Sequence, residues 1–350
     1  MPFVGLGSLA SSDELDGWSF YGLLNFGVLS VDNGGSTETY FGENGQVPSR
    51  VGAFWKSRTD QGTSVVFNFE TGLGFTQLSE VSPSNDDFDI QFDMRQLRKL
   101  EVIFSSDQYG RVSLGQGSMA SDGASGVDLS GTSLAHGPAI GDLGGATEFL
   151  LPDETGSGVL VSDVFDDLDG PRRFRVRYDT PDWNGLRASF AYGQEVLRSG
   201  NDLDYRDVAL TYTSEFERFV TEAAVSYEWI DDEEERALAS ASILDKPTGL
   251  NGTIATGHNE IGDGRYVYIK LGIARDAFTV GKTAVSIEHY AGDDLGFVGS
   301  ASDAIGIGFT QNLADLNLDL VATIRRYGLS SSSQDFTDID VAMIGARWRF

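Results

Sequence analysis

Charged and apolar side chains alternate in residues 172–193, which read RRFRVRYDTPDWNGLRASFAYG. Successive side chains of a β-strand point to opposite faces, so one face here is apolar and the other charged. The apolar face carries Phe174, Val176 and Tyr178, and the opposite face carries Arg173, Arg175, Arg177 and Asp179. The turn at 181–185 is followed by a second alternating segment. This pair of segments predicts a β-hairpin with one oily and one ionic side.

The same period of two recurs along most of the chain, with glycine, aromatic and β-branched residues in place of long helical patterns. It predicts sixteen strands, at residues 18–31, 47–57, 63–76, 96–105, 109–117, 172–181, 185–195, 203–213, 217–230, 236–244, 249–259, 265–275, 278–291, 301–312, 315–328 and 339–350. The fold class is therefore all-β.

The expected connections alternate between short and long. Short turns are expected at 59–62, 106–108, 181–184, 214–217, 245–249 and 313–315, and long polar connections at 32–46, 77–95, 118–171, 292–300 and 329–338. A chain of this kind runs up and down, with its short turns at one end. Short turns at one end and long loops at the other are typical of an outer-membrane barrel.

The two faces then have a physical explanation. Hydrocarbon cannot hydrogen-bond a backbone, so a sheet in lipid must close on itself and present an apolar exterior. We therefore expect a closed antiparallel transmembrane β-barrel of about 16 strands whose charged face lines the lumen. A barrel of this width encloses water, which removes the cost of burying unpaired arginines.

The composition narrows the possible partners. Net charge is −28, from 53 acidic and 25 basic residues, which argues against nucleic acid because phosphate binding needs a basic surface. The chain has no cysteine, which excludes disulfides and thiol chemistry. No apolar run reaches the roughly 18 to 20 residues of a membrane helix.

The expected organisation is an amino-terminal tail at 1–16 and a single barrel domain at 17–350 that includes a long loop at 118–171. The amino end lacks the basic and apolar regions of a signal peptide, so we expect a mature chain. A soluble acidic β-domain remains open as an alternative, because single alternating strands also occur in soluble sheets.

Several segments carry a more specific likeness. They are GQGSMASDG (115–123), VDLSGTS (127–133), FDDLDGPRRFRVRYDTP (165–181), DKPTGLN (245–251), YVYIKLG (266–272), GKTAVSIEHY (281–290), TQNL (310–313) and DIDVAMIGARWRF (338–350). With them the chain resembles bacterial outer-membrane porins of the general-diffusion type, in detail those of Alphaproteobacteria. The resemblance implies a homotrimer in outer-membrane lipid, a long third loop folded into the lumen as a constriction, and a terminal Phe350 read by the insertion machinery.

Strand parity and this resemblance together indicate the candidate site. The expected basic wall of the pore consists of Arg50, Lys99, Arg111, Arg173, Arg175 and Arg177, and the expected acids of the constriction loop are Asp122, Asp128, Asp142, Glu148, Asp163 and Asp166. Acids facing arginines would create a transverse field, and charged patches decide ion preference in pores. The acidic excess favours cations.

Other motifs give weaker indications. The acidic run at 231–236 could hold Ca²⁺, although a solvated loop explains it as well. His136, His258 and His289 lack the spacing of a zinc site. No cofactor is expected. Ser130 and Ser133 lack the surrounding motif of a hydrolase nucleophile.

The expected function is passive diffusion of ions and small hydrophilic solutes, without enzymatic chemistry. The alternatives are a substrate-selective outer-membrane channel, an outer-membrane hydrolase and the soluble domain.

Overall fold

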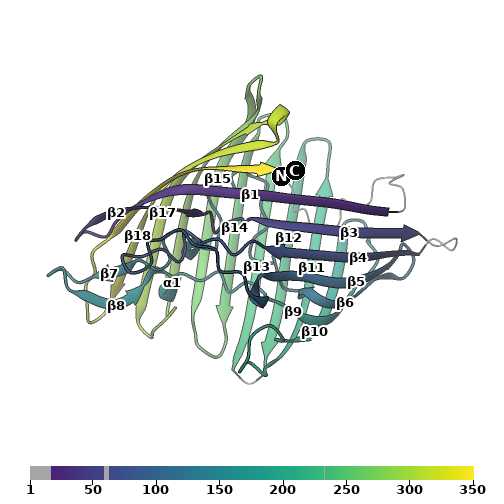
Figure 1. Ribbon diagram of the computed structural model, residues 1–350, viewed down its shortest axis with the longest axis horizontal. Coiled ribbons are helices and arrows are strands. Elements are labelled where there is room, and N and C mark those ends of the chain that lie inside the picture. The colour runs from purple at the N-terminus through teal and green to yellow at the C-terminus, as the bar shows by residue number, and fades with distance from the viewer. Residues whose placement is uncertain (1–16, 59–62, 232) are drawn as a thin grey trace.

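The computed structural model describes residues 17–58, 63–231 and 233–350, and its main feature is an antiparallel sheet that closes on itself (Figure 1). The first strand, β1 (Gly17–Asp32), pairs with the last, β19 (Ile339–Arg349). Their register runs from Leu23 opposite Arg349 to Asp32 opposite Asp340. The predicted closed barrel is confirmed. The predicted tail at 1–16 and the predicted turn at 59–62 lie outside the described residues.

The sheet is continuous around the barrel. Between β1 and β19 it contains β2 (Thr37–Glu43), β3 (Arg50–Arg58), β4 (Ser64–Gly72), β5 (Leu97–Ser106), β6 (Gly110–Ser118), β9 (Arg172–Asp179), β10 (Leu186–Gln194), β11 (Asp204–Glu215), β12 (Phe219–Ile230), β13 (Glu234–Asp245), β14 (Leu250–Asn259), β15 (Arg265–Phe278), β16 (Gly281–Asp293), β17 (Ser300–Leu313) and β18 (Leu318–Ser331). β2 and β3 pair with successive parts of β1 and act as one barrel strand, which gives the predicted sixteen.

The second barrel strand begins earlier than predicted. A connection was expected at 32–46, but β2 already starts at Thr37, and residues 44–49 interrupt the strand instead. The interruption stays hydrogen-bonded to β1, because the amide of Asn44 donates to the carbonyl of Asn25 at 3.0 Å and the amide of Asn25 donates to Ser49 Oγ at 3.0 Å. These local bonds satisfy the backbone where the ladder is broken.

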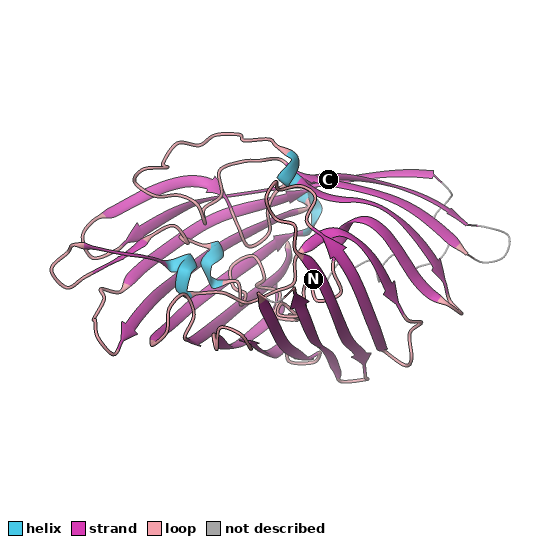
Figure 2. Cartoon of the chain, turned by 90° about the horizontal axis from the view of Figure 1, so that it is seen from below, coloured by secondary structure: helices cyan, strands magenta, loops and turns pink. Residues whose placement is uncertain are grey.

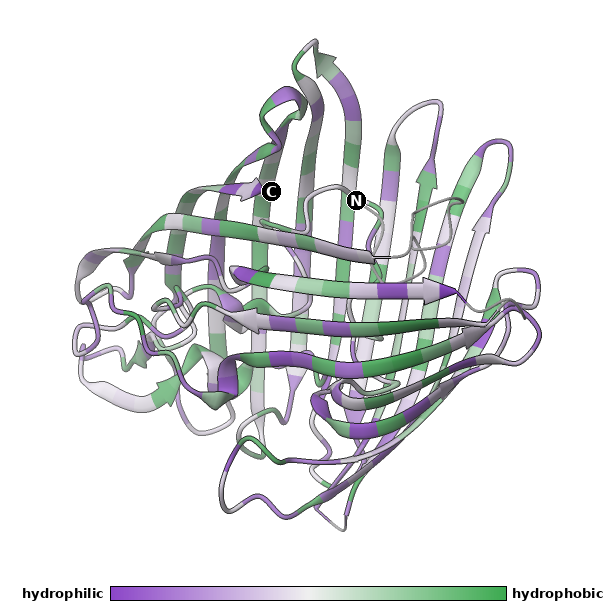
Figure 3. Cartoon of the chain, turned by 45° about the vertical axis from the view of Figure 1, so that its right-hand side comes forward, coloured by the Kyte–Doolittle hydropathy of each residue, from purple (hydrophilic) through white to green (hydrophobic). Residues whose placement is uncertain are grey.

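The apolar side of the sheet faces outward, as predicted. Val267, Ile269 and Leu271 on β15 are exposed, whereas Tyr268 and Lys270 between them are buried on the inner side. The alternation recurs along the other strands as bands of opposite hydropathy (Figure 3). Apolar residues exposed on one side of a closed sheet are what lipid contact requires. Within the described residues, no helix is long and apolar enough to cross a membrane.

The alternation of short turns and long loops is only partly present. Two connections at the long-loop end are short: residues 33–36 join β1 to β2, and residues 231–233 join β12 to β13. Strands on this side of the barrel continue into what was predicted as loop. β13 begins at Glu234, two residues before the predicted start, because its ladder with β12 extends as far as the pair Ile230 and Glu234.

The long third loop, residues 119–171, folds into the barrel and packs against the inner wall, as predicted. It contains β7 (Glu148–Leu150), β8 (Gly156–Leu160), the 3₁₀ turn η3 (Ile140–Asp142) and the single helical turn α1 (Val161–Val164). Two further 3₁₀ turns, η2 (Met94–Gln96) and η4 (Ala314–Leu316), lie in other connections. The helical turns lie against the strands in Figure 2. Loop and wall share one buried apolar cluster, which includes Leu134, Ile140, Phe149, Val161, Phe165, Tyr290, Tyr327, Val341 and Met343.

Candidate channel constriction

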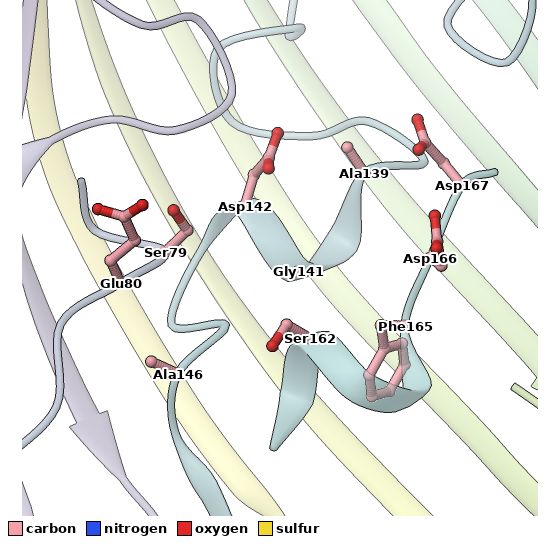
Figure 4. A pocket seen from close by; sticks show the side chains of 10 residues that line it. All are labelled: Ser79, Glu80, Ala139, Gly141, Asp142, Ala146, Ser162, Phe165, Asp166 and Asp167. Atoms are coloured by element: carbon pink, nitrogen blue, oxygen red, sulfur yellow. The ribbon is translucent and has the colours of Figure 1, made fainter. Parts of the chain in front are cut away.

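A cavity of about 500 Å³ opens beside the third loop and is acidic (Figure 4). Its carboxylates come from Asp142, Asp166 and Asp167 of the loop and from Glu80 of the connection between β4 and β5. The other lining residues are small or apolar, and no lysine or arginine is among them. Figure 4 shows Asp142 on η3 and Asp166 and Asp167 directly after α1. The cavity is therefore suited to cations.

The third loop carries its cavity acids in two acidic segments, one at Asp142 and one at Asp166 and Asp167. Tyrosine hydroxyls of the inner wall bond to the backbone of both segments. Tyr327 on β18 donates to the carbonyl oxygen of Leu143, next to Asp142, at 2.5 Å. Tyr290 on β16 donates to the carbonyl oxygen of Asp166 at 2.7 Å, and the Asp166 amide lies 3.3 Å from the same hydroxyl. Both rings are fully buried. The carboxylates thus sit on backbone that is bonded to the barrel.

The loop environment favours the neutral form of three of its acids, Asp142, Asp167 and Asp169. Burial raises the pKa of Asp142 to about 7, and the nearby charge of Asp167 adds to this shift. Burial also raises the pKa values of Asp167 and Asp169, with repulsion from Asp166 and Asp167 respectively as the next cause. Each proton bound removes one negative charge from the loop. The charge of the cavity therefore depends on pH near neutrality.

The other four predicted loop acids have partners elsewhere. Asp122 lies 3.5 Å from Arg172, and Asp128 accepts from Lys270 Nζ at 2.8 Å. Burial alone would raise the pKa of Asp128, but the charge and hydrogen bond of Lys270 together with hydrogen bonds from Ser130 outweigh it, and the pKa lies below its usual value. Glu148 and Asp163 accept backbone amides of Gly158 and Leu160, at 2.6 and 2.8 Å. None of these four lines the acidic cavity.

Two predicted wall residues, Arg50 and Lys99, gather around Glu70 on β4. Their nitrogens lie 3.8 and 3.9 Å from the carboxylate, and Arg98 Nε donates to it at 2.7 Å. Tyr21 of β1 also donates to Glu70, at 2.8 Å. One carboxylate thus faces three cations whose side chains keep about a fifth of their surface exposed. This cluster leaves positive charge on the wall.

The remaining predicted cations lie on β6 and β9. Arg173 lies 3.3 Å from Glu195 and covers the ring of Tyr205 at 3.9 Å. Arg177 pairs with Asp179 at 2.7 Å and donates to the carbonyl of Met119, at the start of the third loop, at 2.5 Å. Arg111 lies opposite Asp179 in the register of β6 and β9.

Arg175 does not line open solvent. Its guanidinium forms an ion pair with Glu101 of β5 and donates to the carbonyls of Gly115 and Ser118, at 2.9 and 3.1 Å. The residue is 4% exposed. Strand parity was read correctly, because the side chain points inward. At this level Glu101 and the end of β6 surround the guanidinium, so Arg175 ties β5, β6 and β9 together and does not meet solutes.

The acidic segments of the third loop lie against a different part of the barrel wall from the cations of β5 and β9. The cations lie on β3, β5 and β9, whereas the acidic segments are bonded to β16 and β18. In sheet order β5 is the fourth and β16 the thirteenth of the sixteen barrel strands. In a closed sheet β5 and β16 therefore lie on opposite sides, whereas β3, which carries Arg50, is only three strands from β18 across the seam of β19 and β1.

Sequence reasoning missed Arg98, Arg172 and Glu80. Arg98 reaches Glu70 because the register shifts between β4 and β5. Glu70 pairs with Lys99, but the next residue, Thr71, pairs with Leu97. The extra residue lets adjacent side chains Arg98 and Lys99 both reach Glu70, which strict alternation forbids. No pattern in the sequence marks Glu80, since it enters the cavity from a different loop.

The acidic run at 231–236 gives no sign of a calcium site in the part that is described. Asp232 lies outside the described residues. Arg236 pairs with Glu234, and Tyr227 donates to Glu235 at 2.6 Å. Among the described residues, no group of three or more acidic or histidine side chains is arranged to hold a metal ion.

Comparison with known proteins agrees with this architecture. A family model described as Gram-negative porin matches residues 4–332. A search of curated protein sequences finds no significant match. Among solved structures, the anion-selective porin from Comamonas acidovorans is similar with a TM-score of 0.63 and 15% identity, over 96% of this chain and 100% of that one.

Two further structures show the same fold. OmpF of Salmonella typhi, solved with daunomycin, has a TM-score of 0.60 and 13% identity, over 96% of this chain and 98% of its own. The trimer form of OmpT, an outer-membrane protein of Vibrio cholerae, has a TM-score of 0.56 and 13% identity, over 96% of this chain and 100% of its own. With a family match over nearly the whole length and a closed barrel that is apolar outside and charged inside, this chain belongs to the Gram-negative porin family and forms an outer-membrane channel.

Proposed function

We propose that the channel conducts ions and small hydrophilic solutes by passive diffusion and prefers cations. The observation that carries the proposal is the acidic cavity, where Glu80, Asp142, Asp166 and Asp167 meet without a basic neighbour in the lining. Charges beside a narrow aqueous path act over a short distance and are poorly screened, so they set which ions enter.

The basic cluster does not cancel this preference. Glu70 is shared by Arg50, Arg98 and Lys99, so part of the positive charge on that wall is already compensated. The field between the two sides would orient dipolar solutes, while the acidic side would concentrate cations. Similarity to an anion-selective porin at 15% identity reflects the shared fold.

The assembly proposed for the channel is a homotrimer in outer-membrane lipid. A related fold was solved in a trimer form, and the exposed apolar side chains of β1, such as Trp18, Phe20 and Val28, offer surface for lipid or for a neighbouring copy. Its membership of the porin family implies transport without covalent chemistry.

Reversal potentials across planar bilayers test the ion preference. A double variant with Asp142→Asn and Asp166→Asn removes two of the cavity charges. Its reversal potential in a KCl gradient should move from the wild-type value toward that of an unselective pore. Asp153→Asn is the matched control, because Asp153 lies in the same loop, outside the cavity, and bonds to Thr155. Equal potentials for all three channels would refute the proposal. Saturating current with one solute class would favour a substrate-selective channel instead.

A further inference from the structure

The segment of the third loop that carries Asp142 is connected to a fully buried ion pair on the barrel wall. Arg325 of β18 and Glu288 of β16 lie 2.6 Å apart, and neither side chain has exposed surface. Arg325 Nη1 donates to the carbonyl of Ile140 at 3.1 Å, and Nη2 reaches the carbonyl of Ala135 at 3.4 Å. A buried guanidinium has its geometry fixed by such bonds. The wall therefore holds the loop through its backbone.

Tyr327 extends this contact to the segment that carries Asp142. Its hydroxyl lies 3.2 Å from Arg325 Nη1, which donates to it, and it donates in turn to the carbonyl of Leu143 at 2.5 Å. The carbonyls of Ile140 and Leu143 bracket Asp142. A hydrogen-bonded chain thus runs from Glu288 through Arg325 and Tyr327 to the backbone that carries this carboxylate.

A second, parallel contact holds the other acidic segment. The Tyr290 hydroxyl bonds both the carbonyl and the amide of Asp166, and the Tyr290 ring packs at a tilt against Phe165, with 5.3 Å between ring centroids. Phe165 also packs on the ring of Tyr327, again at 5.3 Å. Both tyrosines therefore contact the same part of the loop, because the rings of Tyr290 and Tyr327 both pack against Phe165.

Another part of the loop, at His136, is bonded to the same wall by neutral groups. His136 lies between Ser286 Oγ and Thr323 Oγ1, at 2.9 and 3.1 Å. Burial, with the charges of Arg325 and Lys270, lowers the pKa of His136 to about 2, so the imidazole is neutral and its contact with Glu288 is no ion pair. Arg325 is thus the cation that compensates Glu288.

We infer that Tyr327, supported by the ion pair of Arg325 and Glu288, and Tyr290 are positioning residues that hold the cavity carboxylates at fixed places in the lumen and thereby set the ion preference and the steadiness of the open channel. The inference rests on the proposed function for ion preference. Steadiness of the current is independent of it.

The experiment removes single hydroxyls, since deleting one partner of a buried ion pair would also disturb folding. Tyr327→Phe and Tyr290→Phe are recorded as single channels at about pH 8.5, above the raised pKa of Asp142. Loss of one typical hydrogen bond shifts the balance between a seated and a displaced loop about fivefold. We expect larger current fluctuations and a reduced cation-to-anion permeability ratio. Tyr266→Phe is the control, because the Tyr266 hydroxyl is buried and has no hydrogen-bond partner among the described residues.

A second arm combines Tyr327→Phe with Asp142→Asn. If Tyr327 acts by placing Asp142, its effect on the permeability ratio should largely disappear in the Asp142→Asn background, a non-additivity that a general loss of stability would not produce. Folding of each variant is checked by heat-modifiable electrophoretic mobility. A wild-type channel without cation preference would refute the proposed function alone, and the fluctuations would still decide the inference. Folded variants with wild-type fluctuations and permeability would overturn it.

Discussion

Gly22 and Phe350 join the two ends of the sheet. The amide of Gly22 donates to the carbonyl of Phe350 at 2.9 Å, and the amide of Phe350 donates to the carbonyl of Gly22 at 3.1 Å. A Cβ at position 22 would lie 2.5 Å from the Phe350 ring. Only glycine leaves room for this aromatic side chain beside the seam, where the barrel closes.

Gly22→Ala should therefore weaken barrel closure. The methyl group forces the Phe350 ring or the strand to move, and such overpacking costs about 1 to 3 kcal/mol. Gly252→Ala is a suitable control because its Cβ would meet Leu271 at an ordinary 3.5 Å. The fraction of heat-resistant barrel on electrophoresis measures the effect. Equal melting of both variants would show that the seam tolerates the methyl group.

Glu101→Gln should destabilise the barrel without a specific change in ion preference. It leaves the buried Arg175 without its countercharge, and breaking a buried ion pair in this way costs about 3 to 5 kcal/mol. Unfolding in urea from lipid vesicles gives the free energy. Arg175→Glu, which would raise cation preference if Arg175 met solutes, should instead impair folding. A folded Arg175→Glu channel with altered selectivity would contradict the burial.

Cation preference should increase with pH between about 5 and 8. Asp142, with a pKa near 7, faces Asp166 and Asp167 from the loop and Arg325 from the wall. A carboxyl whose pKa is raised by folding favours the folded state at low pH, and this contribution is lost as pH rises through about 7. Charge appears in the cavity over the same range. Reversal potentials at several pH values measure the change in cation preference. Asp142→Asn should flatten the dependence of the reversal potential on pH.

A charge placed on the outer surface of β15 should be costly only if lipid lies there. Ile269→Arg puts a guanidinium at an exposed mid-strand position, where the expected penalty in a bilayer is about 2 to 4 kcal/mol. Ile269→Leu is the control. Unfolding free energies in phospholipid vesicles measure the difference. Similar stabilities would mean that this surface contacts water.

The period of two in the sequence was sufficient to predict the barrel and its inside-out polarity. Positions such as Ile269 and Lys270 differ by a single step along a strand, and the pleat alone decides their faces. Strand ends were less predictable. β2 begins at Thr37 because its backbone pairs with β1; the threonines and aromatics of 37–43 favour a strand, but the segment lacks the strict alternation on which the prediction relied.

Parity gave the direction of the wall arginines but not their surroundings. Arg175 points inward as expected, yet Glu101 of β5 and the backbone of β6 enclose it. Which loop acids reach the cavity also depends on how the loop folds. Asp142 and Asp128 look alike in sequence, and only the position of Lys270 on the wall separates a paired acid from one that faces solvent.

Single-channel recording of the wild-type protein in a planar bilayer, with a roughly tenfold KCl gradient, tests the central claim most directly. We expect steady current steps that increase with salt without saturating, and a reversal potential with the sign of cation preference. Silent bilayers, or a reversal potential with the sign of anion preference, would contradict it.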